Sequence, residues 1–97
     1  MRRNDLTERL LKFSVDVILF LRKLPVGEDY SIIKKQLVRS ATSSGANYEE
    51  AQGGTSNADF SFRVGIALKE MRESWYWLKI IHGITQNEHL MLECTDS

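Results

Sequence analysis

The stretch that decides the fold is residues 33–51, IKKQLVRSATSSGANYEEA. Apolar or small residues recur along it at spacings of three and four, which is the periodicity of one face of a helix. From Ser40 to Ala46 every side chain is small, and Ser, Thr and Gly all lower helix stability relative to Ala. Because the periodicity stays in phase, we predict one continuous helix, against which another helix backbone packs closely. The alternative is a flexible Ser-rich linker that divides the segment in two.

An amphipathic helix is predicted before this segment, over residues 5–24. Pro25 cannot continue the backbone hydrogen bonds of a helix, and Gly27 follows it, so the first helix ends there. The central helix then opens at residues 28–31, where two acidic residues suit the positive end of the helix dipole. The apolar face of the first helix is predicted to consist of Leu6, Leu10, Phe13, Val17, Phe20 or Leu21, and Leu24.

A turn and a third helix follow the central helix. Residues 53–57, GGTSN, have the composition of a turn, and the third helix is predicted from about Ala58 to Ile84. Gly83 and residues 85–88 then predict a break and a short fourth helix, which carries Leu90 and Met91 and has Cys94 near its end. The predicted core face of the third helix consists of Phe60, Val64, Ala67, Met71, Trp75, Leu78 and Ile81.

These elements predict an all-α fold, an antiparallel up-down four-helix bundle with a short or truncated fourth helix, forming one domain over residues 1–97. A short fourth helix leaves apolar surface uncovered on its neighbours. Tyr76 and Trp77 are predicted to lie exposed beside the core face of the third helix, and residues 18–20 widen the apolar surface of the first. Surplus apolar surface of this kind indicates a partner, and we predict self-association.

Composition narrows the class of protein. The chain has 97 residues, 13 Lys and Arg against 13 Asp and Glu, and one Cys. One Cys cannot form a disulfide within the chain, and a net charge of zero gives no support to nucleic-acid binding. The longest apolar run near the start, residues 17–21, is too short for a signal peptide or a membrane span. A cytoplasmic protein without a membrane partner is predicted.

No residue pattern indicates an enzyme or a cofactor site. The Gly53-Gly54 turn lacks the spacing and the preceding strand of a phosphate loop. His82, His89, Glu93 and Cys94 have no recognised zinc spacing, and they are interpreted as solvated residues near a helix end. Serines of the small-residue stretch have no His or acidic partner at a recognisable spacing. We therefore expect no catalytic residue, no metal, no cofactor and no small-molecule substrate.

One flank of the central helix is basic. Lys34, Lys35 and Arg39 are candidate nucleic-acid-binding residues, and with Arg2, Arg3 and Arg9 they would form a basic patch. The alternative, which we favour, is a solvated flank balanced by nearby acidic residues. The helical periodicity of the central and third helices further predicts that their facing sides bring Glu73 to Arg39 or Asn47 in a partly buried polar contact.

Two stretches resemble the "four helix bundle protein" group, also called the 23S rRNA-intervening-sequence protein family after insertions in bacterial rRNA genes. They are residues 36–51, QLVRSATSSGANYEEA, and residues 62–78, FRVGIALKEMRESWYWL. The resemblance implies a left-handed antiparallel four-helix bundle that assembles as a ring-like homopentamer without catalytic residues. Arg39, Asn47, Glu50 and Glu73 match recurring polar positions of the family, and we expect them to make structural polar contacts.

The chain also departs from the family. A related accessory protein of diversity-generating retroelements is strongly basic and binds a reverse transcriptase, whereas the net charge here is zero. The family usually continues through a full fourth helix, so an end at Ser97 indicates a shortened fourth helix or an incomplete chain. The leading hypothesis is a non-enzymatic homo-oligomer, pentameric by resemblance. The alternative is an accessory factor for RNA or a nucleic-acid-processing protein, with Lys34, Lys35 and Arg39 repeated around the ring.

Overall fold

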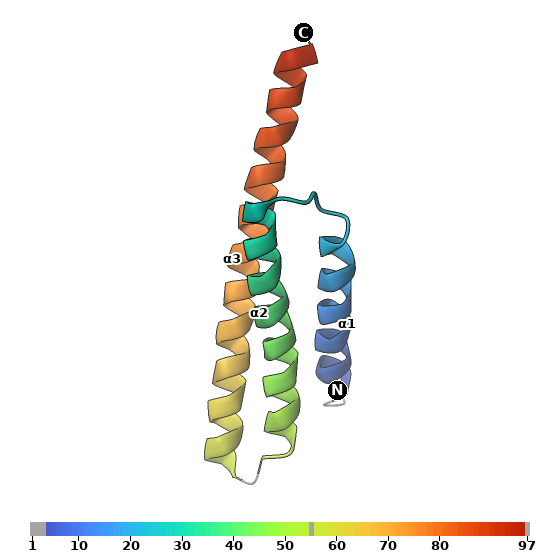
Figure 1. The fold of residues 1–97 in the computed structure, drawn as a ribbon. Coiled ribbons are helices and arrows are strands. Elements are labelled where there is room, and N and C mark those ends of the chain that lie inside the picture. Colours follow the sequence, from blue (N-terminus) through green and yellow to red (C-terminus); the bar gives the residue numbers. More distant parts are fainter. Residues whose placement is uncertain (1–3, 55, 97) are drawn as a thin grey trace.

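The protein folds as three α-helices in a computed structural model that describes the backbone of residues 4–54 and 56–96 and the side chains of residues 5–54 and 56–88. The helices are α1 (Asn4–Leu21), α2 (Glu28–Gln52) and α3 (Asn57–Asp96). Consecutive helices run antiparallel, and α3 extends well beyond the other two (Figure 1). The molecule is accordingly elongated, with extents of 62 × 21 × 19 Å. The all-α prediction is confirmed for the part of the chain that is described.

The central helix is continuous through its small-residue stretch, as predicted. Its hydroxyl groups bond back to the helix backbone instead of breaking it: Thr42 Oγ1 donates to the Val38 carbonyl at 2.7 Å, and Ser44 Oγ donates to the Ala41 carbonyl at 2.7 Å. Such bonds satisfy the side-chain hydroxyl within the helix. The linker alternative is therefore wrong.

Small side chains let α1 and α3 approach α2 from two sides. A Cβ atom added at Gly45 would lie 3.6 Å from Leu10 Cβ and 3.7 Å from the Leu10 carbonyl oxygen of α1. One turn away, Ser14 Oγ of α1 donates to the Ala41 carbonyl at 3.2 Å. On the other side, the hydroxyl oxygens of Ser40 and Ser74 are 2.7 Å apart, joining α2 to α3. The predicted close backbone approach thus occurs within one chain, and on both sides of α2.

The core lies where all three helices meet. Leu37 and Ala41 of α2 are completely buried at its centre. Two apolar residues of α1 and one of α3 cover them, and partly buried side chains such as Phe13 and Leu78 pack around this cluster. The buried residues of the cluster are Val17, Leu21, Ile33, Leu37, Ala41 and Ile81.

The prediction of a four-helix bundle is wrong, because α3 continues through the predicted break. Thr85 Oγ1 donates to the carbonyls of Ile81 and His82, both at 3.0 Å, so its hydroxyl is satisfied inside the helix. Gly83 is exposed and would have nothing within 4 Å of an added Cβ, so no packing contact forces a bend there. No proline follows Pro25, and glycine or threonine alone weakens a helix without ending it. The predicted fourth-helix residues Leu90, Met91 and Cys94 belong to α3, and their side chains lie outside the described residues.

Candidate functional site

The predicted core face of α3 is only partly covered, and two of its aromatic residues are exposed. Only Ala67 and Ile81 on that face are buried. Trp75 is 62% exposed, Leu68 beside the face is 52% exposed and Phe60 is 42% exposed. One apolar stripe runs along α3, with residues spaced by four, four, three and four positions. We call it the open face, and it consists of Phe60, Val64, Leu68, Met71 and Trp75.

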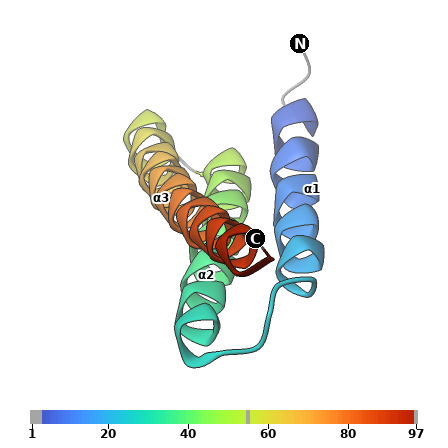
Figure 2. The same cartoon turned by 90° about the horizontal axis from the view of Figure 1, so that it is seen from above.

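The open face exists because the backbones of α1 and α3 both pack closely on α2 and stay apart from each other, although side chains of all three helices share the core. No described Cα atom of α1 lies within 8 Å of one of α3. Viewed along the bundle, α3 begins on the side of α2 away from α1, and its C-terminal end crosses over α2 toward α1 (Figure 2). In a four-helix bundle the remaining side is covered by a further helix. Here the described part of the chain supplies no such helix, and α1 likewise leaves Phe20 41% exposed.

The rotation of α3 exchanges the predicted places of two tryptophans. Because Ser74 faces Ser40 of α2, Trp77 lies partly buried against the core, and its Nε1 donates to Glu73 Oε2 at 3.0 Å. Trp75 lies exposed, with the Lys79 ammonium 5.9 Å from the centre of its ring. Tyr76 is exposed as predicted. The expectation of a buried Trp75 and an exposed Trp77 is therefore wrong, because four-three periodicity alone does not fix the rotation of a helix that is apolar over a wide arc.

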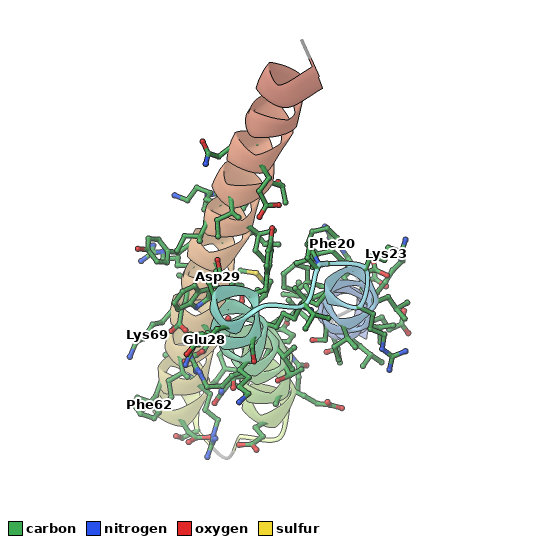
Figure 3. All side chains as sticks on the ribbon, turned by 45° about the horizontal axis from the view of Figure 1, so that its top comes forward. Phe20, Lys23, Glu28, Asp29, Phe62 and Lys69 are labelled. Atoms are coloured by element: carbon green, nitrogen blue, oxygen red, sulfur yellow. The ribbon has the colours of Figure 1, made fainter. Side chains whose placement is uncertain are left out.

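A second side of α3 also carries apolar groups. Phe62 is 65% exposed, and Phe62 and Lys69, seven residues apart, project from the helix away from α2 (Figure 3). Lys69 shows that this side mixes apolar and charged residues. It differs in this from the open face, which consists of apolar residues only.

A polar cluster connects α2 to α3 beside the core. The Arg39 guanidinium forms ion pairs with Glu73 and with Glu70, whose Oε2 lies 3.0 Å from Arg39 Nη1. The hydrogen bond from Trp77, followed by that from Arg39, lowers the pKa of Glu73, while the bond to Glu73 raises the pKa of Arg39. The predicted contact between Arg39 and Glu73 is present.

The other two predicted polar positions make separate contacts. Asn47 Nδ2 donates to the Ser43 carbonyl at 2.9 Å, within α2, so Asn47 does not meet Glu73. Glu50 Oε2 accepts from Arg63 Nη1 at 2.5 Å, which ties the end of α2 to the start of α3. Arg63 in turn lies 3.4 Å from Asp59 on its own helix. Sequence periodicity gave no signal for two of these ion pairs, Arg39–Glu70 and Glu50–Arg63.

The basic flank of α2 borders a groove between α1 and α2. Lys34, Lys35 and Arg39 line it from α2, and Arg22, the first residue after α1, lines it from the other side. The structure brings together these three predicted residues and adds Arg22, which sequence reasoning missed because it lies outside α2, in the turn after α1. Arg9 does not line this groove, and Arg2 and Arg3 lie outside the described residues. Arg39 is already paired with acidic residues of α3, so it contributes less net positive charge than the sequence suggested.

The described residues offer neither a metal site nor a membrane-spanning helix. No group of three or more His, Cys, Asp and Glu residues in the described part could hold a metal ion. None of the described helices is long and apolar enough to cross a membrane. The side chains of His89, Glu93 and Cys94 lie outside the described residues.

Sequence comparison then decides the family. The profile of the 23S rRNA-intervening sequence protein matches residues 2–91. The chain belongs to that family. A solved structure from Bacteroides thetaiotaomicron, described as a protein with unknown function from the S23 ribosomal protein family, superposes with a TM-score of 0.78 at 36% identity. The match covers 87% of this chain and 75% of that chain. No curated protein matches the chain in sequence.

The polar cluster leads to a prediction about pH. Because the pKa of Glu73 is lowered in the folded state, its ionised form stabilises the fold above the unfolded pKa, near 4.5. That contribution is lost as pH falls through the folded pKa. Glu73→Gln should lower the free energy of unfolding at pH 7 by about 1 kcal/mol, since the pair is partly exposed.

Urea unfolding of both chains between pH 7 and pH 3.5 measures this effect. The difference between the wild type and Glu73→Gln should shrink toward the acid end. A difference that stays constant with pH would show that the carboxylate charge of Glu73 does not stabilise the fold. Glu49→Gln, at an exposed position of α2 outside the cluster, is the matched control.

Proposed function

We propose that this chain is a non-enzymatic helical scaffold that assembles with copies of itself, and that the open face is the surface buried in the assembly. The single observation that supports the proposal most strongly is the exposure of Trp75, Leu68 and Phe60 along one stripe of α3. A contiguous exposed apolar patch on a folded domain usually marks a site of interaction with another molecule. Each large apolar side chain that a partner covers would contribute about 1–2 kcal/mol to the free energy of association.

A second copy is the partner that we favour. The open face is apolar along its length, and homodimer and obligate interfaces are more apolar than transient ones. The family resemblance implies a ring of five copies, and we propose that stoichiometry. A single Cys suits a reducing compartment, so we place the assembly in the cytoplasm. No catalytic residue or cofactor takes part in this proposal.

Light scattering coupled to size-exclusion chromatography, over a range of protein concentrations, tests the proposal. The wild type should reach about five times the chain mass of 11.2 kDa. Leu68→Glu combined with Trp75→Glu should shift the mass toward that of one chain, because a buried carboxylate without a partner is costly. Val26→Glu is the matched control, because Val26 is 99% exposed in the loop between α1 and α2.

Two results would contradict the proposal. One is a wild type that stays monomeric at every concentration. The other is a Leu68→Glu, Trp75→Glu chain that is folded by circular dichroism and keeps the mass of the wild type. The folding control is needed because Leu68 and Trp75 directly follow the buried residues Ala67 and Ser74.

An RNA-associated role is the second candidate, and one observation favours it. Arg22, just after the end of α1, borders the same groove as Lys34 and Lys35 of α2. If an assembly repeats this group, single-stranded RNA should bind with an affinity that falls as salt rises, with a logarithmic slope of about −2 for three phosphate contacts. Filter binding of a fluorescent RNA between 50 and 300 mM salt measures the slope. The absence of binding at the lowest salt concentration would rule this role out.

A further inference from the structure

The groove between α1 and α2 has an apolar floor and a basic rim. Ile18 and Leu21 of α1 and Val38 of α2 provide its apolar lining, and its volume is about 540 Å³. The basic side chains Arg22, Lys34, Lys35 and Arg39 surround this lining. An apolar channel between two neighbouring helices is the shape into which the side-chain ridge of a third helix packs.

Of the four basic side chains at the groove, only Arg39 has its positive charge balanced by an ion pair that the structure describes. Arg39 is paired with Glu70 and Glu73. Lys34 Nζ bonds to two neutral acceptors, the carbonyls of Leu24 and Pro25, at 3.4 and 3.2 Å. Arg22 and Lys35 form no ion pair with any other side chain that the structure describes. The groove therefore suits an apolar helix that also carries carboxylates.

The total charge of the chain is neutral, but basic and acidic residues are distributed unevenly along the sequence. Nine of the 13 Lys and Arg residues lie within the first 39 residues, around α1 and the start of α2. After Lys79 there is no Lys or Arg, whereas residues 88–96, EHLMLECTD, contain three acidic and three consecutive apolar residues. The end of α3 thus has the composition that complements the groove.

The end of α3 is also placed where another molecule can reach it. The Tyr30 hydroxyl, in the first turn of α2, donates to Glu88 Oε2 at 3.2 Å. Beyond this contact α3 continues past the start of α2 and past the loop that joins α1 to α2, clear of both helices (Figure 1). Within one chain, the helix that complements the groove therefore points away from it.

We propose that residues 88–96 of α3 from one copy dock in the α1–α2 groove of a second copy. The inference rests on the proposed self-association but uses a different surface from the open face. The contact joins two unlike surfaces, so it is heterologous: it generates a closed ring or an open filament, depending on the rotation between copies. The docked segment would cover the apolar lining around Ile18 and Val38 and bring acidic residues near Arg22 and Lys35.

Fluorescence anisotropy with a peptide tests the contact directly. The probe is a fluorescein-labelled peptide of residues 84–97 that carries Cys94→Ser to prevent disulfide formation. The receptor is the full chain with Leu68→Glu and Trp75→Glu, in which the open face is disrupted. We expect saturable binding with one peptide per chain, weakened several-fold between 50 and 500 mM salt because exposed charges are screened.

Charge reversal identifies the groove as the site. Arg22→Glu combined with Lys35→Glu should raise the dissociation constant of the peptide at least tenfold. Both constants are measured with receptors that carry Leu68→Glu and Trp75→Glu. Lys23→Glu is the matched control, because Lys23 is exposed and projects away from α2 without lining the groove (Figure 3). A peptide that carries Glu88→Lys and Glu93→Lys should bind the Arg22→Glu, Lys35→Glu chain more tightly than the unchanged peptide does.

The outcomes separate this inference from the proposed function. Absence of saturable binding, or binding that the groove substitutions leave unchanged, overturns the docking of α3 in the groove whatever the oligomeric state. If the Leu68→Glu, Trp75→Glu chain stays oligomeric while the peptide still binds through the groove, the docking contact is supported and the open face is not the assembly surface.

Discussion

The close packing made possible by the small side chains of α2 is the constraint on which the rest of the structure depends. Ser14 of α1 reaches the Ala41 carbonyl on one side, and Ser74 of α3 meets Ser40 on the other. A larger side chain at either contact would push a neighbouring helix outward and open the core around Leu37. Two flanking helices therefore depend on a few residues of one central helix, and α2 is the only helix that touches both among the residues described.

This arrangement also determines which surfaces stay uncovered. Because the backbones of α1 and α3 pack on α2 and stay apart from one another, Phe60, Leu68 and Trp75 on the remaining side of α3 stay exposed in the described chain. The contact between Ser40 and Ser74 fixes the rotation of α3, which turns Trp77 toward the core and Trp75 toward solvent. The same packing creates the groove on α1 and α2 whose basic rim includes Arg22 and Lys35. Both proposed assembly surfaces are thus consequences of one packing arrangement.

Much of the fold could be predicted from the sequence, since helical periodicity is strong in residues 5–24 and 33–51 and the chain's one proline falls between helices. The break after Ile84 could not, because Gly83 and Thr85 lower helix stability without forbidding a helix, and α3 continues through them. The exposure of Trp75 was missed for a different reason. Periodicity places residues on a face, but only the contact made by Ser74 shows which part of a wide apolar arc α2 covers. The contact between Arg39 and Glu73 was predictable because both lie on facing flanks of adjacent helices, whereas the second ion pair, with Glu70, depends on the exact rotation of α3.

Tryptophan fluorescence tests most directly whether the open face is buried in an assembly. In the Trp77→Phe variant, Trp75 is the one remaining tryptophan and reports on the open face. Its emission maximum should lie at the wavelength of a water-exposed indole at high dilution and shift to shorter wavelength as protein concentration rises. In the Trp75→Phe variant, Trp77 lies beside the core of a single chain, so its emission should not change with concentration. Emission from Trp75 that stays at the exposed wavelength throughout the concentration range would contradict the account.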